Sequence, residues 1–301
     1  MAGRWVAPGV AALVLLSAWP GARAEEAFLT CQPADEVVVA ADGRRAFVTS
    51  PDGKALSVID TQARRVVARL PLAGGPLGVA VAPAGAPVYV ADWYGARLFV
   101  VDPDRPDAVR TIAVGASPSG VAVTPDGAFV LTADRDDDAV SVIDAARLER
   151  VAVIAVGRRP FGITVDGAGR RAYTANVGSD DVTVIDLATR TVAGTVKVGA
   201  RPYAVALAGA SAFVSNQYGG TVSVFDVAGL AVRATIGVGE YPEGIAASSD
   251  GARVFVANWF DNSLSVIDTA SLKVVASLAV CDGPRAFGAF IRAAGEGDDR
   301  R

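Results

Sequence analysis

Few side chains in this sequence can take part in acid–base, nucleophilic or metal chemistry. The chain has no histidine, only two cysteines (Cys31 and Cys281) and a single methionine, Met1. These counts exclude a Ser-His-Asp or Cys-His arrangement, a histidine-ligated metal, and a haem held by histidine or methionine. A metal would have to bind to oxygen ligands, which favours Ca²⁺ or Mg²⁺.

Carboxylates offer two places where a cation or a catalytic group could lie. The stretch from Asp134 to Asp138 is the densest acidic segment, and Asp180 and Asp181 follow further along the chain. Their spacing matches no known calcium loop, so we interpret them as solvated loop residues. Glu243 is the other candidate, but no second carboxylate stands at an equivalent position. We therefore predict no catalytic residue, no metal ligand and no resident cofactor.

Three markers recur along the chain with one spacing. An aspartate after an apolar run, a proline and a turn glycine each recur every 42 residues, with one interval of 40. Each unit holds four short Val- and Ile-rich runs separated by Asp-Gly or Asn-containing loops, which is the pattern of four antiparallel strands. The aspartates are Asp60, Asp102, Asp144, Asp186, Asp226 and Asp268, and the prolines are Pro76, Pro118, Pro160, Pro202, Pro242 and Pro284.

Four strands in such a unit are typical of one blade of a β-propeller. Six complete units between residues 35 and 280 predict an all-β propeller of six four-stranded blades. Residues 284–291 look like the first strand of a further unit and residues 27–30 could add a second, so seven blades with an incomplete last one remain the alternative. Cys31 and Cys281 occur at the same phase of the repeat, and we predict that they form a disulfide across the seam of the ring.

The first 24 residues have the pattern of an export signal. Arg4 precedes a mostly apolar run from Val6 to Ala18, and Ala22-Arg23-Ala24 is typical of a signal-peptidase site. We expect a signal peptide over 1–24, one propeller domain over 25–292 and a disordered tail over 293–301. The protein would then be periplasmic, secreted or at the cell surface, with no membrane span.

The repeat units resemble the YVTN family of β-propeller repeats. The matching segments read PSGVAVTPDG, AYTAN, AFVSN, VFVAN, TVSVFD, LSVID and VVASLAV. The resemblance covers about residues 35–291 and implies an exported propeller of the YncE-like or surface-layer type, with a binding or structural role. Similar propellers include the haem d1 domain of nitrite reductase, lactonases and proteins encoded near quinone-dependent dehydrogenases. The absence of histidine argues against carrying over the haem ligation.

Positions that differ between units are the candidates for function, since whatever recurs in every unit is architectural. Antiparallel strand order places the link before each proline and the loop after each second strand on one face, here called the upper face. Aromatic side chains and arginines gather at these variable positions, as they do in binding surfaces. The predicted binding residues are Trp93, Tyr94, Arg159, Phe161, Arg201, Tyr203, Tyr218, Glu243, Trp259, Phe260 and Arg285.

The sequence therefore favours an exported, non-catalytic binding or scaffold protein, acting as a monomer. It would bind a partner protein or a small ligand at its upper face and at the mouth of the central channel. One alternative is a calcium-type, lactonase-like hydrolase centred on Glu243. The other, by family analogy alone, is an accessory protein of a periplasmic quinone-dependent redox system. A net charge of −4, which becomes −6 without Arg4 and Arg23, disfavours a nucleic-acid partner.

Overall fold

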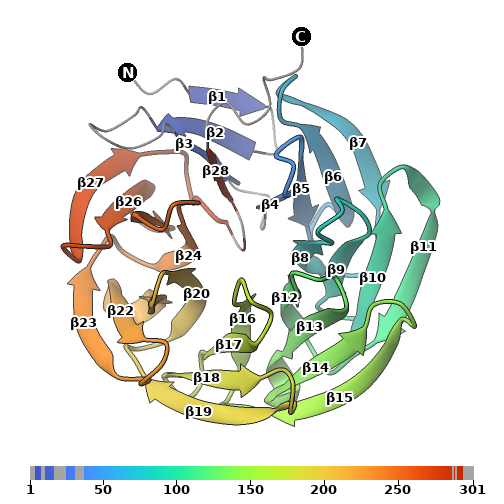
Figure 1. Ribbon diagram of the computed structural model, residues 1–301. Helices are drawn as coiled ribbons and strands as arrows, with labels where there is room; N and C mark the ends of the chain where they lie inside the picture. Colours follow the sequence, from blue (N-terminus) through green and yellow to red (C-terminus); the bar gives the residue numbers. More distant parts are fainter. Residues whose placement is uncertain are drawn as a thin grey trace.

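Antiparallel four-stranded sheets form a ring around a central channel (Figure 1). The computed structural model describes residues 4–7, 11–16, 25–30, 37–286, 288 and 290–293. Six of its sheets are the six sequence repeats, each made of four consecutive strands, with the first strand of each lining the channel. The predicted all-β propeller with six four-stranded repeat blades is confirmed.

The first three blades contain β4 (Val37–Val39), β5 (Arg45–Ser50), β6 (Ala55–Asp60) and β7 (Arg65–Pro71); β8 (Pro76–Val81), β9 (Val88–Asp92), β10 (Arg97–Asp102) and β11 (Arg105–Ala113); and β12 (Pro118–Val123), β13 (Phe129–Asp134), β14 (Ala139–Asp144) and β15 (Glu149–Ala155). The next three contain β16 (Pro160–Val165), β17 (Arg171–Asn176), β18 (Asp181–Asp186) and β19 (Thr191–Lys197); β20 (Pro202–Ala208), β21 (Ser211–Asn216), β22 (Thr221–Asp226) and β23 (Val232–Gly237); and β24 (Pro242–Ala247), β25 (Arg253–Asn258), β26 (Ser263–Asp268) and β27 (Lys273–Ala279). Single 3₁₀ turns, η1 (Arg135–Asp137) and η2 (Gln217–Gly219), follow two of the second strands. Among the described residues, no helix has the length and apolar character needed to cross a bilayer.

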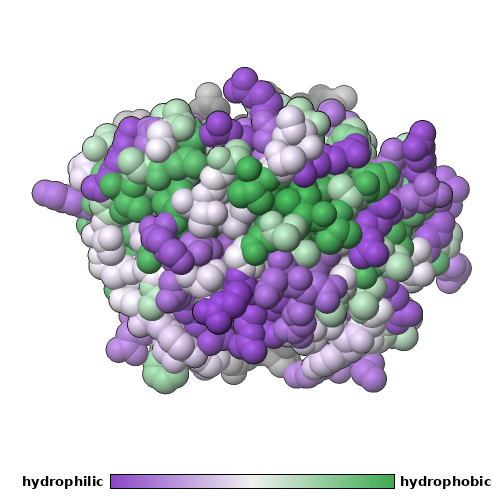
Figure 2. All heavy atoms as spheres, turned by 90° about the horizontal axis from the view of Figure 1, so that it is seen from below, coloured by the Kyte–Doolittle hydropathy of each residue, from purple (hydrophilic) through white to green (hydrophobic). Residues whose placement is uncertain are grey.

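Burial differs between the inner and outer strands of each blade. The second and third strands are buried along most of their length, whereas the outer strands expose valines such as Val153 on β15 and Val192 on β19. Seen from the side, the apolar surface of the ring is broken up by hydrophilic side chains (Figure 2). The core therefore lies between neighbouring blades, where the faces of their sheets meet.

The recurring aspartates hold the turns that follow the third strands. The Asp144 carboxylate accepts hydrogen bonds from the backbone N–H groups of Ala146 (3.0 Å) and Arg147 (2.9 Å), and Asp226 does the same for Ala228 and Gly229. This is the geometry of an Asx turn. The architectural role predicted for these aspartates is confirmed.

A polar residue ends each second strand, and in every repeat blade but the first it is buried against the link that enters its own blade. Asn176 donates through Nδ2 to the Thr183 hydroxyl (2.9 Å), and a Cβ atom at the link residue Gly157 would lie only 2.5 Å from that nitrogen. The glycine is therefore required by the close approach of the link. Equivalent pairs recur in the next two blades, where Asn216 donates to Ser223 and Asn258 donates to Ser265.

A seventh sheet, made from both ends of the chain, fills the gap between the first and last repeats. Its order is β1 (Arg4–Ala7), β2 (Ala11–Leu16), β3 (Glu25–Leu29) and β28 (Ile291–Ala293). Residues 27–30 and 284–291, which the seven-blade alternative assigns to one further blade, pair directly in the bridge between Thr30 and Arg285 and in the bond from Phe28 N–H to Phe290 O (2.8 Å). The sheet has four strands rather than two because β1 and β2 add to its outer side.

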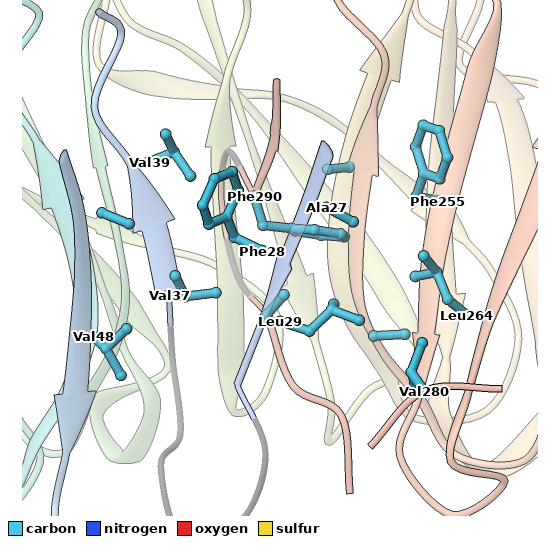
Figure 3. Packing of buried hydrophobic residues seen from close by; sticks show 14 of the residues in the cluster. Ala27, Phe28, Leu29, Val37, Val39, Val48, Phe255, Leu264, Val280 and Phe290 are labelled. Carbon is cyan, nitrogen blue, oxygen red and sulfur yellow. The ribbon is translucent and has the colours of Figure 1, made fainter. Parts of the chain in front are cut away.

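Side chains of this seventh sheet close the ring. Figure 3 shows Phe28, Leu29 and Phe290 between the valines of the first blade and the side chains of Phe255 and Leu264 in the last. All five are at most 4% exposed. Hydrophobic burial thus joins the two ends of the repeat array.

β1 and β2 fall within the predicted signal peptide, whose processing remains a prediction, as does the domain division. The expected cleavage site at 22–24 and the expected tail, apart from Ala293, lie outside the described residues.

The predicted disulfide involves one described cysteine. Cys281 is buried, and its Sγ lies 3.9 Å from the carbonyl oxygen of Thr30, the residue before Cys31 in the sequence. Cys31 itself lies outside the described residues, so the pairing remains a prediction. Cys281 stands three residues before its link proline, as Gly157 and Gly199 stand before theirs. At these two glycines a Cβ atom would lie 2.5 Å from the asparagine that ends the second strand of the same blade.

We expect a Cys31–Cys281 bond in protein isolated from an oxidising compartment. Its denatured mass should be about 2 Da below that of the dithiol, and reduction should lower the unfolding temperature because the bond closes a long loop. Denaturing mass spectrometry and thermal melts with and without reductant make the two measurements. Alkylation of both cysteines in the unreduced, denatured protein would contradict the bond.

Replacing Asp134 with Asn should stabilise the protein at neutral pH. Asp134 takes the place of Asn176, and burial raises the pKa of its carboxyl despite hydrogen bonds from Ser141, Thr132 and Gly115. The folded protein therefore holds the proton of this carboxyl more tightly than the unfolded chain, in which the pKa is about 4. As the pH rises from that value through the raised pKa of the folded protein, the contribution of Asp134 to the free energy of unfolding falls.

We expect Asp134→Asn to gain about 1 kcal/mol at pH 7 in urea unfolding and to lose the gain towards pH 4. Asp92→Asn is the matched control. Asp92 is fully buried but pairs with Arg97 at 2.8 Å, so its replacement should reduce stability. A loss of stability in Asp134→Asn equal to that in Asp92→Asn would contradict this reasoning.

Candidate functional site

The links and the loops after the second strands lie side by side, as the strand order predicts. The backbone N–H of Trp93 donates to the carbonyl of Gly75 at 2.9 Å, and the N–H of Trp259 donates to that of Tyr241 at 2.9 Å. These bonds tie each loop to the link of its own blade. The variable residues of both segments therefore share the upper face.

Part of the channel mouth is filled by packed rings. Phe161 stacks on Tyr203 with 4.3 Å between ring centroids, and Trp93 approaches Phe161 at 6.1 Å. Phe161 and Tyr203 are only 9% exposed, and Leu77 packs against the same cluster. We call Trp93, Phe161 and Tyr203 the aromatic plug. The plug leaves these predicted binding residues little surface for a ligand.

The blade between these aromatics contributes a small residue. Ser119 stands at the position that Phe161 has in its own blade, and it is fully buried. Its hydroxyl is 3.0 Å from the carbonyl oxygen of Phe161. This small side chain leaves room for Trp93 to reach Phe161 across the intervening blade.

The other side of the mouth holds a buried ion pair. Glu243 is 3% exposed, accepts a hydrogen bond from Gln217 Nε2 at 2.6 Å and lies 3.2 Å from Arg285 Nε. The Arg285 guanidinium also lies over the Trp259 ring, 5.5 Å from its centroid. Both carboxylate oxygens of Glu243 thus have partners on the protein, and within the described part of the chain no three acidic or cysteine side chains gather as a metal site would require.

Beside this pair lies an exposed group of rings, here called the aromatic cluster: Tyr218, Tyr241, Trp259 and Phe260. Tyr241 is at its centre, with ring centroids 5.7 Å from Tyr218, 6.1 Å from Trp259 and 5.6 Å from Phe260. Tyr218 and Phe260 are each 60% exposed, and Tyr241 is 37% exposed. The cluster spans two blades and forms a continuous apolar surface.

Arg201 extends this surface at one end. Its Nη1 donates to the hydroxyl of Tyr218 at 2.7 Å, and its guanidinium lies 4.6 Å from the centroid of the same ring. A cation held over an aromatic face in this way is attracted by the ring's electrons. Arg201 is thereby fixed in place beside the cluster.

The structure places the remaining predicted residues apart from the cluster. Tyr94 is 81% exposed and lies over the link at Gly75 on the second blade. Arg159 is exposed on the link before β16, where its backbone N–H donates to the Asp138 carboxylate at 2.7 Å. These two residues belong to other parts of the upper face.

The sequence prediction omitted Tyr241. The signal was present, since Tyr241 precedes its link proline as Arg159 and Arg201 precede theirs. All three adopt a left-handed backbone, with φ between 53° and 55°. The predicted set includes Arg159 and Arg201 from this position but leaves out Tyr241, the ring that joins the others.

Residues 23–128 match the family model of the YNCE-like β-propeller. The resemblance inferred from the repeats is confirmed over that stretch. No protein of curated function matches the sequence.

Solved propellers match the fold over most of the chain. A chain of the Kuenenia stuttgartiensis hydrazine synthase is 20% identical with a TM-score of 0.77, covering 84% of this chain and 88% of that one. A functionally unknown protein from Desulfotomaculum acetoxidans is 17% identical with a TM-score of 0.71, covering 86% and 94%. At such identities the likeness shows the fold alone.

The plug and the cluster should respond differently to truncation. Phe161→Ala removes a buried ring and should lower the free energy of unfolding by about 3 kcal/mol. Phe260→Ala removes an exposed ring and should change it by less than about 0.5 kcal/mol. Urea unfolding of both variants tests the distinction, and equal losses would show that the two rings are buried alike.

Proposed function

We propose that this protein is an exported, non-catalytic propeller that binds a partner protein through the aromatic cluster and the adjacent Arg201. The observation that carries the proposal is the exposure of Tyr218, Tyr241 and Phe260 as one contiguous surface. Grouped rings left in water cost free energy that a partner surface would recover. Tyrosine, tryptophan and arginine are also the residues that dominate binding energy at protein interfaces.

Pre-organisation supports the same conclusion. The ring contacts around Tyr241 and the hydrogen bond from Arg201 to Tyr218 hold these side chains before any partner arrives. Binding would then lose little side-chain entropy. A surface fixed in advance favours a partner of fixed shape.

The backbone gives a further reason to assign a role to these side chains. Arg201 and Tyr241 have positive φ, a conformation that costs an ordinary residue about 1 kcal/mol and that Gly283 adopts at the equivalent position without a Cβ atom. The fold would be served by glycine at each of these links. Arg201 and Tyr241 therefore supply side chains that the backbone at these links does not require.

A protein partner fits this surface better than a small ligand held in the mouth. Phe161 and Tyr203 already occupy the mouth, and Glu243 is paired with Arg285. What remains exposed is a broad ridge across two blades. A broad apolar ridge with an arginine beside it is typical of a protein interface.

The test is capture of the partner with the mature protein, followed by affinity measurements with the purified partner. Tyr218→Ala/Phe260→Ala should bind at least tenfold more weakly by titration calorimetry, because it removes the two most exposed rings of the cluster. Val153→Ala/Val192→Ala removes exposed apolar side chains from two outer strands and should bind like wild type. Equal affinity of the aromatic double variant and wild type would refute the proposal.

A further inference from the structure

The central channel holds a cavity of about 640 Å³ on the lower face, opposite the aromatic cluster. The first strand of each repeat blade contributes one side chain to its wall at the same level: Val39, Val81, Val123, Val165, Leu207 and Ala247. A volume of this size is typical of pockets for small organic molecules.

Apolar atoms make up most of the wall of this cavity, and polar atoms make up the rest. None of the described residues that line it has a charged side chain, and the hydroxyl groups of two of them bond to the protein. Thr164 donates to the carbonyl of Val205 at 2.7 Å, and Ser248 donates to the Asp250 carboxylate at 2.6 Å. A ligand inside would therefore meet mainly apolar atoms.

The channel narrows above this cavity. A space of only about 20 Å³ lies there, and six β-branched residues are among those that line it: Val79, Val121, Ile163, Thr164, Val205 and Ile245. Further along the same strands lies the aromatic plug, where Phe161 stacks on Tyr203. The cavity is therefore entered from the lower face.

Carboxylates stand at this entrance. Asp42, Asp126, Asp166 and Asp250 lie in the turns between first and second strands, each within two residues of a residue of the cavity wall. Hydrogen bonds from the hydroxyls of Thr124 and Ser248 lower the pKa of Asp126 and Asp250, which keeps both ionised. The same turns hold two exposed arginines, Arg44 and Arg170, so the turns themselves carry more aspartates than arginines. Arg253, which begins the strand after the last turn, also interacts with Asp250.

We propose that the cavity binds the hydrocarbon chain of a cationic amphiphile, with its positive head among the carboxylates of these turns. An apolar wall gives no directional contact, so the chain would be held by burial of its methylene groups. The acidic turns would select the charge of the head. This site is separate from the aromatic cluster and does not depend on the proposed partner.

Isothermal titration with dodecyltrimethylammonium, below its micelle concentration, tests the proposal on the mature protein. We expect saturable binding at one site, at least tenfold weaker binding of dodecanoate, and no binding of tetramethylammonium, which lacks the chain. Binding of dodecanoate as tight as that of the cation would overturn the assignment of the head group. No saturable binding of either chain would overturn the site.

Variants locate the binding. Val123→Phe and Val165→Phe each place a larger ring in the cavity from different blades and should weaken binding at least tenfold, while Val153→Phe on an outer strand should not. Thermal melts identify whichever cavity variant keeps its fold, and wild-type affinity in such a variant would refute the site.

Asp126→Asn/Asp250→Asn preserves the turn geometry and should reduce the preference for the cation. Tyr218→Ala/Phe260→Ala should bind the amphiphile normally, which separates this proposal from the partner proposal.

Discussion

A ring of sheets is stable only if its last gap is filled, and in this protein β3 and β28 fill it. Each repeat blade buries its two faces against its neighbours, so the first and last repeats would expose theirs without the seventh sheet. Phe28 and Phe290 cover both of these faces at once. The channel, the mouth and the upper face all depend on this closure.

The closure also reaches into the candidate site. Arg285 pairs through its backbone with Thr30 of the closing segment and extends its guanidinium to Glu243 and over Trp259. One residue of the closing strand thereby contacts both the buried carboxylate and the aromatic cluster. The geometry of the binding surface is coupled to the joining of the chain ends.

Much of the fold could be predicted because its rules are local. Apolar alternation, turn aspartates and the spacing of prolines act within one blade, and the six blades follow from them. The burial of Phe161 and Tyr203 could not be predicted in this way, since it depends on rings from different blades and on the small Ser119 between them. The central place of Tyr241 was missed for a similar reason, because its neighbours come from two loops that are distant in sequence.

The pairing within the closing sheet has a mechanical consequence. Glu25 and Ala293 are register partners on antiparallel strands, so a mature chain beginning at Glu25 would start at the end of the ladder where β28 stops. Tension applied between Glu25 and Ala293 would load the backbone hydrogen bonds of this ladder one at a time rather than all together. The ring would then open by peeling from this corner, and a covalent bond at Cys281 would stop the peeling before the first repeat blade separated from the last.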